Sequence, residues 1–186
     1  MIKGKTLAVI MLIAVTGAAP VYAETKYVNS RDGLRVRDKP SEKGKTIDVV
    51  PYGAAVSTVD DTILNGWYRI EHGNLAAYIS SEFTQDENPL AEMTHMGKWR
   101  ITAYAYTGSP CANGNFPQEE YTIACNSLPF GTEVFISGVG FRTVEDRGPA
   151  GMGDEWLDLY LGNTDACVQW GDQYLDVYVV EEEEGK

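Results

Sequence analysis

The chain has 186 residues, 15 basic and 27 acidic, so its formal charge is −12 at pH 7. This charge argues against partners bound through phosphate contacts, such as nucleic acids and anionic lipid surfaces. The length allows one medium domain or two small ones. Three cysteines and two distant histidines lack the spacing of a structural zinc site, and no glycine-rich nucleotide-binding motif occurs. We therefore expect neither a metal nor a cofactor.

The first 23 residues have the pattern of a secretory signal peptide. Two lysines precede an apolar run over 7–15, and Val21-Tyr22-Ala23 places the predicted cleavage after Ala23. The alternative is a membrane anchor, but the run is short for a bilayer and is interrupted by Gly17 and Pro20. The sequence thus predicts a secreted, extracellular or wall-associated protein whose mature form has no membrane segment.

The remaining chain divides by charge and pattern into two parts. Residues 24–85 carry a net charge of −1, whereas residues 86–186 carry −13. The polar stretch Asp86-Glu87-Asn88-Pro89 begins a predicted linker over 86–97, because its proline disfavours helix and central strand. The closing glutamate run predicts an exposed acidic tail at 182–186.

The first part reads as short strands separated by turns. Leu34 and Val36 alternate with arginines, and Asn65-Gly66 is a strong hairpin signal before Trp67. Strands this short at regular spacing predict a small all-β barrel over 24–85.

This part resembles the bacterial SH3-type domain. The resemblance is carried by Gly33-Leu34-Arg35-Val36-Arg37-Asp38-Lys39-Pro40-Ser41, Trp67-Tyr68-Arg69-Ile70 and Ala77-Tyr78-Ile79-Ser80-Ser81-Glu82-Phe83. In that family such modules commonly bind cell-wall peptides and catalyse no reaction. The resemblance therefore implies that the peptide stem of peptidoglycan binds here.

The second part also reads as strands, with one short helix. The helix is predicted over 165–170, where Asn163-Thr164 forms its cap and Gly171 ends it. Strands are predicted over 99–107, 121–126, 133–137, 141–147, 156–161 and 175–180. One helix among six strands predicts a compact β-barrel over 98–181.

Asp146 and Asp158 are the most informative polar residues because each interrupts an apolar strand. The segment between them, 147–153, is rich in glycine, which suits a loop that approaches a ligand closely. Desolvation and a second nearby carboxylate both raise the pKa of an acid, as a general acid near neutral pH requires. The alternatives are an aspartate bound by backbone N–H groups and one on the solvent face of a half-buried strand.

Four segments in order resemble the 3D (three-aspartate) domain: 122–132, 144–148, 157–160 and 170–180. That family is similar to the catalytic part of membrane-bound lytic transglycosylase A. The resemblance implies a six-stranded double-psi β-barrel with a short helix and an activity that cleaves peptidoglycan glycan strands. The whole chain is accordingly predicted to be mainly β.

The resemblance assigns Asp146 and Asp158 as catalytic residues. Asn126 stands in place of the first aspartate, and Arg147 replaces the threonine after the second. An amide accepts and donates hydrogen bonds but carries no proton in acid–base catalysis. Substrate contacts are expected from Asn126, Arg147, Trp156 and Tyr160, the two aromatic rings by stacking on sugars or by core packing.

Asp158 is expected to be the main acid. Its side chain points opposite to those of Leu157 and Leu159, so it faces outward if they face the barrel interior. Arg147 is expected to keep Asp146 ionised, and Asn126 to bond the substrate or the Asp158 carboxyl. The implied reaction yields a 1,6-anhydro sugar, while attack by water gives hydrolysis.

Two other functions remain open. One is a non-enzymatic peptidoglycan-binding protein with a degenerate 3D barrel, and the other is an O-glycosyl hydrolase for another polysaccharide.

His72, in a hairpin turn, and His95, in the linker, are expected on the surface. Cys125 is expected in the core if Asn126 faces the cleft, and any disulfide between Cys111, Cys125 and Cys167 is left open.

Overall fold

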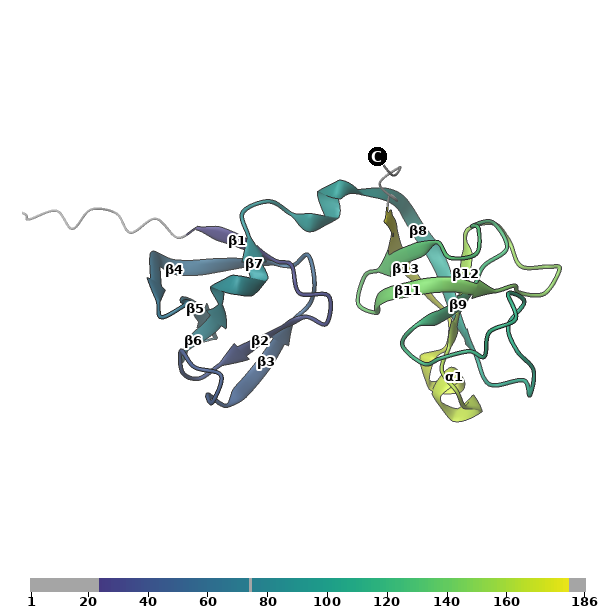
Figure 1. Cartoon of the computed structure of the whole chain (residues 1–186), viewed down its shortest axis with the longest axis horizontal. Coiled ribbons are helices and arrows are strands. Elements are labelled where there is room, and N and C mark those ends of the chain that lie inside the picture. Colours follow the sequence, from purple (N-terminus) through teal and green to yellow (C-terminus); the bar gives the residue numbers. More distant parts are fainter. Residues whose placement is uncertain (1–23, 74, 181–186) are drawn as a thin grey trace, which may run out of the picture.

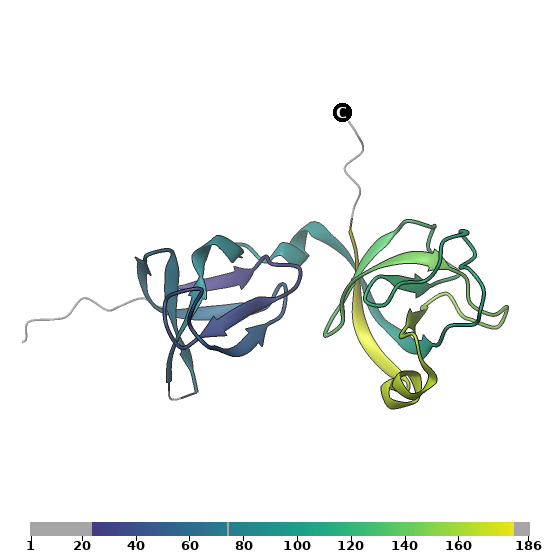
Figure 2. The same cartoon turned by 60° about the horizontal axis from the view of Figure 1, so that its bottom comes forward.

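The computed structural model describes residues 24–73 and 75–180 and contains two β-rich units arranged along its long axis (Figures 1 and 2). The predicted leader, 1–23, and the predicted tail, 182–186, lie outside the described residues. No helix in the described part of the chain is long and apolar enough to cross a membrane. The mainly β character predicted from the sequence is confirmed.

The first unit is a seven-stranded sheet with the strand order β3-β2-β6-β5-β4-β1-β7, in which every pair is antiparallel. Its elements are β1 (Thr25–Val28), β2 (Leu34–Arg37), β3 (Thr46–Val50), β4 (Ala55–Leu64), β5 (Trp67–His72), β6 (Leu75–Ser80), the 3₁₀ turn η1 (Ser81–Phe83) and β7 (Thr84–Gln85).

Local sequence explains the main features of this sheet. The predicted hairpin at Asn65-Gly66 joins β4 to β5, and both residues have positive φ, 52° and 85°, as a type I′ turn requires. The alternation over β2 buries Leu34 and Val36. They pack in a small core with Val28, Ile70, Ala77 and Ile79.

The second unit is a closed six-stranded barrel with the order β10-β11-β9-β12-β8-β13. Its elements are β8 (Met93–Tyr104), β9 (Thr122–Ala124), β10 (Glu133–Ile136), β11 (Gly140–Asp146), β12 (Trp156–Tyr160), α1 (Thr164–Trp170) and β13 (Gln173–Val180).

The pairing pattern of the barrel has an internal two-fold symmetry. The pattern is unchanged when β8 is exchanged with β11, β9 with β12 and β10 with β13. Every strand then keeps equivalent neighbours, and each pair keeps its parallel or antiparallel direction. The exchange includes the two parallel pairs, β8 with β12 and β9 with β11. These interlocked halves form the predicted double-psi barrel.

Strand β8 differs from its predicted extent. It begins at Met93, five residues before the boundary expected at 98, because β13 continues to Val180 and pairs with it. The segment before it holds the 3₁₀ turn η2 (Pro89–Glu92). His95 consequently lies in β8 rather than in a linker, and its exposed ring contacts Asp176 at 3.1 Å.

The predicted helix and the predicted core position of Cys125 are both confirmed. Asn163 caps α1 by accepting a hydrogen bond from the Ala166 N–H at 2.9 Å, and Gly171 ends the helix with φ of 71°. Cys125 is fully buried, and all three cysteines are free.

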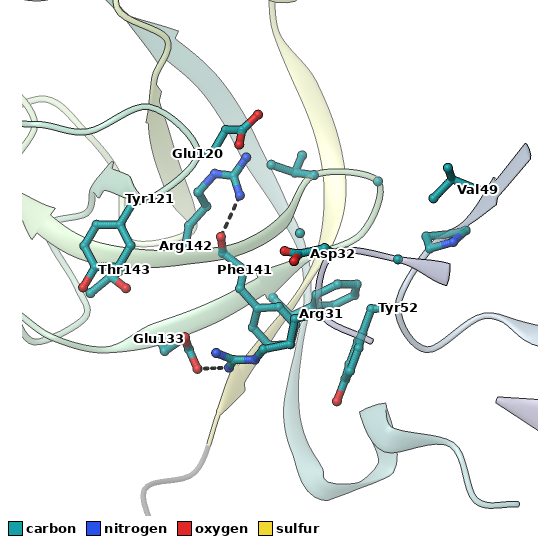
Figure 3. Close-up of a pocket in the computed structure, with 16 residues that line it drawn as sticks. Arg31, Asp32, Val49, Tyr52, Glu120, Tyr121, Glu133, Phe141, Arg142 and Thr143 are labelled. Atoms are coloured by element: carbon teal, nitrogen blue, oxygen red, sulfur yellow. Dashed lines mark hydrogen bonds and ion pairs between the residues drawn. The ribbon is translucent and has the colours of Figure 1, made fainter. Parts of the chain in front are cut away.

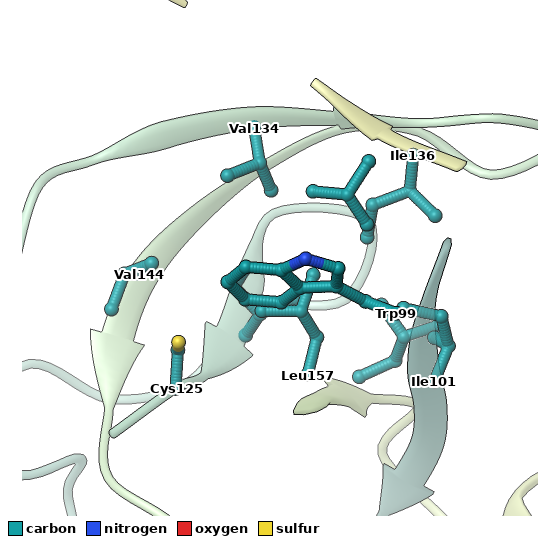
Figure 4. Close-up of a cluster of buried hydrophobic side chains, with 10 residues drawn as sticks. Trp99, Ile101, Cys125, Val134, Ile136, Val144 and Leu157 are labelled. Atoms are coloured by element: carbon teal, nitrogen blue, oxygen red, sulfur yellow. The ribbon is translucent and has the colours of Figure 1, made fainter. Parts of the chain in front are cut away.

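The barrel core lies around Trp99 (Figure 4). The indole donates to the Met96 carbonyl at 3.2 Å, so its one polar atom is bonded. Fully or nearly fully buried aliphatic residues from the surrounding strands pack with it: Ile101, Ile123, Val134, Ile136, Val144, Leu157, Leu159 and Val177. Because these side chains fill the interior, polar side chains that alternate with them face outward.

Candidate active site

The alternation in β12 decides the direction of Asp158. Leu157 and Leu159 are 0% and 1% exposed and belong to the barrel core. Asp158, between them, is half-buried on the outer face of the barrel. This is the orientation expected from the sequence if the two leucines face the barrel interior.

Strand register places four residues in one row across the outer face. Asp146 of β11 pairs with Ala124 of β9, Ala124 pairs with Asp158 of β12, and Asp158 pairs with Thr102 of β8. Neighbouring strands lie about 4.8 Å apart, so the backbones of the two aspartates are separated by about 10 Å. The side chain between them is the methyl group of Ala124, which is 3% exposed, and the two carboxylates are close enough for the charge of Asp146 to act on Asp158.

Asp158 is held by a directed chain of hydrogen bonds. The Trp156 Nε1–H donates to Thr102 Oγ1 at 2.7 Å, and Thr102 Oγ1 lies 2.7 Å from Asp158 Oδ1. Because an indole N–H only donates, the threonine oxygen accepts from it and the hydroxyl proton points to Asp158. Oδ1 is therefore an acceptor, and a proton on this carboxyl resides on Oδ2.

Among the described residues, no hydrogen bond reaches the second oxygen of Asp158, Oδ2. No buried side-chain nitrogen or oxygen in the described residues lacks a hydrogen bond, so an unbonded Oδ2 is accessible to solvent. The carboxyl thus presents its proton-carrying atom outward. A general acid needs this geometry to donate its proton to a substrate oxygen.

The surroundings raise the pKa of Asp158 above its usual value. Burial is the largest cause, and the negative charge of Asp146 adds to it. The hydrogen bond from Thr102 and the positive charge of Arg100 oppose the rise. The Arg100 charge is partly offset because its guanidinium forms an ion pair with Asp172 at 2.7 Å.

Asp146 is bonded by three donors of the protein itself. Its Oδ1 accepts from the backbone N–H groups of Ala112 at 2.9 Å and Arg147 at 2.8 Å. Its Oδ2 accepts from the Tyr104 hydroxyl at 3.2 Å. Burial and the nearby Asp146 charge raise the pKa of Tyr104, so this phenol remains a donor. These three donors fix the orientation of the Asp146 carboxyl group.

The side-chain contact expected between Arg147 and the Asp146 carboxylate does not form. Its guanidinium donates to the Cys125 carbonyl at 2.5 Å and lies 3.7 Å from the centre of the Phe130 ring. Only its backbone N–H reaches the Asp146 carboxylate. Arg147 thus joins β11 to the segment after β9 and forms no ion pair with Asp146.

The Asn126 side chain also forms hydrogen bonds within the protein. Its amide donates to the Pro149 carbonyl at 3.2 Å and accepts from the Gly148 N–H at 3.0 Å. These bonds hold the start of the glycine-rich loop, and none reaches Asp158. The hydrogen bond expected between Asn126 and Asp158 is therefore absent from the described contacts.

The two predicted aromatic residues flank Asp158 along β12. Trp156 has the Arg100 guanidinium 4.0 Å from its ring centre, so one face of the indole is covered. Tyr160 lies 5.4 Å from the ring of Tyr104, and burial raises the pKa of Tyr160. Both rings are half-buried on the outer face of the barrel, beside the acid.

Sequence analysis missed Thr102, Tyr104 and Glu145. Glu145 is 5% exposed and accepts from Thr122 Oγ1 at 2.6 Å. It also accepts from the side-chain amides of Asn113 and Asn115 at 3.3 and 2.8 Å. Burial opposes the ionisation of Glu145, but the three hydrogen bonds outweigh it and lower its pKa.

A β-bulge explains why both Glu145 and Asp146 leave the core. The register of β11 against β9 shifts between Val144 and Asp146, which places two successive carboxylates away from the interior. Two successive acidic residues, Glu145 and Asp146, within an otherwise apolar strand were the sequence feature from which this bulge could have been predicted. Glu145 and Asp146 together fasten the loop that precedes β9.

The first unit has a groove of its own, with a volume of about 610 Å³. Arg37 lies 6.0 Å from the Trp67 ring centre and donates to the Gly44 carbonyl at 2.7 Å. Phe83 is 43% exposed. We call this the first-unit groove, and its lining includes Asp32, Arg35, Arg37, Glu42, Trp67 and Phe83.

Comparison with known proteins identifies one family. Residues 32–85 match the bacterial SH3 domain, which confirms that part of the resemblance. No curated protein and no solved structure matches the chain. Within the described residues, no group of three or more histidine, cysteine or acidic side chains is arranged to hold a metal ion.

Proposed function

We propose that this chain is a secreted cell-wall protein in which the SH3 unit binds peptidoglycan and the barrel cleaves its glycan strands. The single observation that carries the enzymatic part is the Asp158 carboxyl. Its Oδ1 is fixed by Thr102, its Oδ2 is open, and burial raises its pKa. The bacterial SH3 match supports the wall-binding part, because such domains commonly bind cell-wall material.

The barrel is proposed to be a 3D-type domain. The motif series over 122–180 supports this assignment, as does the interlocked double-psi pairing of its two halves. The two matching aspartates occupy one row on the outer face, separated by Ala124. The resemblance implies that these two aspartates are the catalytic residues.

The proposed reaction uses Asp158 twice. Protonated Oδ2 donates its proton to the glycosidic oxygen between N-acetylmuramic acid and N-acetylglucosamine as the C–O bond breaks. The resulting carboxylate then takes the proton of the muramoyl 6-hydroxyl, whose oxygen bonds to the anomeric carbon and closes a 1,6-anhydro ring. Asp146 stabilises the positive charge that develops at that carbon. Attack by water in place of the 6-hydroxyl gives hydrolysis.

A non-enzymatic wall-binding protein is the second candidate, favoured by one observation. Asp146 accepts three hydrogen bonds from the protein, and Asn126 is bonded to the glycine-rich loop. Asp158 is then the one carboxyl of this row with an open oxygen. If a single carboxyl is insufficient, the same surface binds glycan without cleaving it.

Digestion of purified peptidoglycan by the protein from residue 24 onward distinguishes these candidates. Mass spectrometry of the released muropeptides identifies anhydro ends or reducing ends. Asp158→Asn is expected to abolish release while retention on insoluble peptidoglycan is unchanged. Asp165→Asn is the matched control, because this aspartate is exposed on α1. Absence of release by the wild type between pH 4 and 9 refutes the enzymatic function, and retention on the wall then supports the second candidate.

A further inference from the structure

A cleft of about 630 Å³ lies between the two units (Figure 3). Arg31, Asp32, Val49 and Tyr52 line it from the first unit. The barrel contributes the β10–β11 hairpin, Glu120 and Tyr121. The volume falls within the range of about 300–1,000 Å³ that is typical of ligand sites. We call this the interunit cleft.

Direct contacts fix the walls of the interunit cleft. The Tyr52 ring packs against Phe135 and Phe141, with ring centres 5.4 and 4.9 Å apart. Arg31 lies 3.9 Å from the Phe141 ring centre and forms an ion pair with Glu133. Aromatic and cation–π contacts of this kind are attractive and hold the two walls together. The cleft is therefore formed before a ligand arrives.

Three charged groups in the cleft, Arg142, Asp32 and Glu120, form no ion pair among the described residues. The half-buried Arg142 guanidinium donates to the Phe141 carbonyl at 2.6 Å, and no ion pair of the described residues includes it. Burial lowers the pKa of Arg142, while the charge of Glu120 opposes this at longer range. The exposed Asp32 carboxylate forms neither a hydrogen bond nor an ion pair within the described chain. A guanidinium has five N–H donors, so most of those on Arg142 are open to a ligand.

The interunit cleft continues into the first-unit groove. Asp32, Gly33 and Val49 line both hollows, so the two hollows adjoin each other. An open cation, an open carboxylate and aromatic walls together suit a short peptide that has a free carboxylate and an amine.

We propose that the interunit cleft binds the peptide stem of peptidoglycan, with Arg142 of the barrel binding a stem carboxylate and Asp32 binding a stem amine. The inference rests on the proposed wall function and deepens it, because the stem is bound by both units rather than by the SH3 unit alone. It also places Arg142 about 13 Å along β11 from Asp146, at about 3.3 Å per residue.

Isothermal titration calorimetry with a synthetic Ala-γ-Glu-Lys-Ala tetrapeptide tests this proposal. The comparison ligand is the same peptide with both carboxylates amidated. Because a hydrogen bond between charged groups is worth a factor of about ten or more, the wild type is expected to bind the free acid at least about tenfold more tightly. Arg142→Gln is expected to bring this ratio close to one, and Arg142→Lys to restore part of it.

Arg69→Gln is the matched control, since this arginine is exposed and lines neither hollow. It is expected to keep the wild-type ratio. A wild type without preference for the free acid, or an Arg142→Gln variant that keeps the preference, overturns the proposal. If circular dichroism shows that Arg142→Gln is unfolded, Arg142→Lys is compared with the wild type instead. A reduced preference for the free acid then supports the proposal, and an unchanged preference overturns it. Glycan cleavage by the wild type is measured separately, so failure of the cleft and failure of the enzyme are distinguishable.

Discussion

Replacing Thr102 by valine tests whether Asp158 is tuned as the structure implies. The substitution keeps the shape of the side chain but removes the hydroxyl that donates to Asp158 Oδ1 at 2.7 Å. It also removes the acceptor of the Trp156 Nε1–H. A hydrogen bond to a charged acceptor is worth about 1.5–3 kcal/mol, and about 1.4 kcal/mol corresponds to one pH unit. The ionised form of Asp158 therefore becomes less stable, and its pKa rises further.

The assay is the pH dependence of kcat/KM for glycan cleavage. The first step requires protonated Asp158, so the rate falls as pH rises through its pKa. In Thr102→Val this basic limb is expected to move upward by about one to two pH units. Thr102→Ser keeps the hydroxyl and is expected to leave the limb in place. A limb that does not move in Thr102→Val refutes the assignment of Asp158 as the acid.

Three further predictions concern stability. The pKa of Asp158 is raised above 3.8 on folding, so the folded chain binds the extra proton and stability decreases as pH rises from 3.8 through the raised pKa. Thermal unfolding from pH 3 to 8 should thus show Asp158→Asn gaining stability relative to the wild type as pH rises, and parallel curves would contradict this. The pKa of Glu145 is lowered below 4.5, so its contribution is present above 4.5 and is lost as pH falls through the folded pKa. Glu145→Gln is expected to cost about 1–3 kcal/mol at pH 7 in urea unfolding, and less in acid; an equal cost at both pH values speaks against an ionised Glu145. Leu157 is fully buried, so Leu157→Ala is expected to lower the free energy of unfolding by about 2–5 kcal/mol, whereas a cost below about 1 kcal/mol would place it outside the core.

Short-range features could be predicted because they depend on residues close in sequence. The hairpin at Asn65-Gly66 follows from two residues that tolerate positive φ. The bounds of α1 follow from the Asn163 cap and from Gly171. The outward direction of Asp158 follows from strand alternation once its leucine neighbours are assigned to the core.

Tertiary structure alone decided which groups the side chains of the candidate active site contact. Thr102 is 56 residues from Asp158, and only the parallel pairing of β8 with β12 makes them neighbours. Arg147 follows Asp146 directly, yet its guanidinium turns to the Cys125 carbonyl because the fold brings that acceptor close. Asn126 is likewise used by the glycine-rich loop. Alternation and caps are local, whereas hydrogen-bond partners and desolvation depend on which distant strands the barrel closure places side by side.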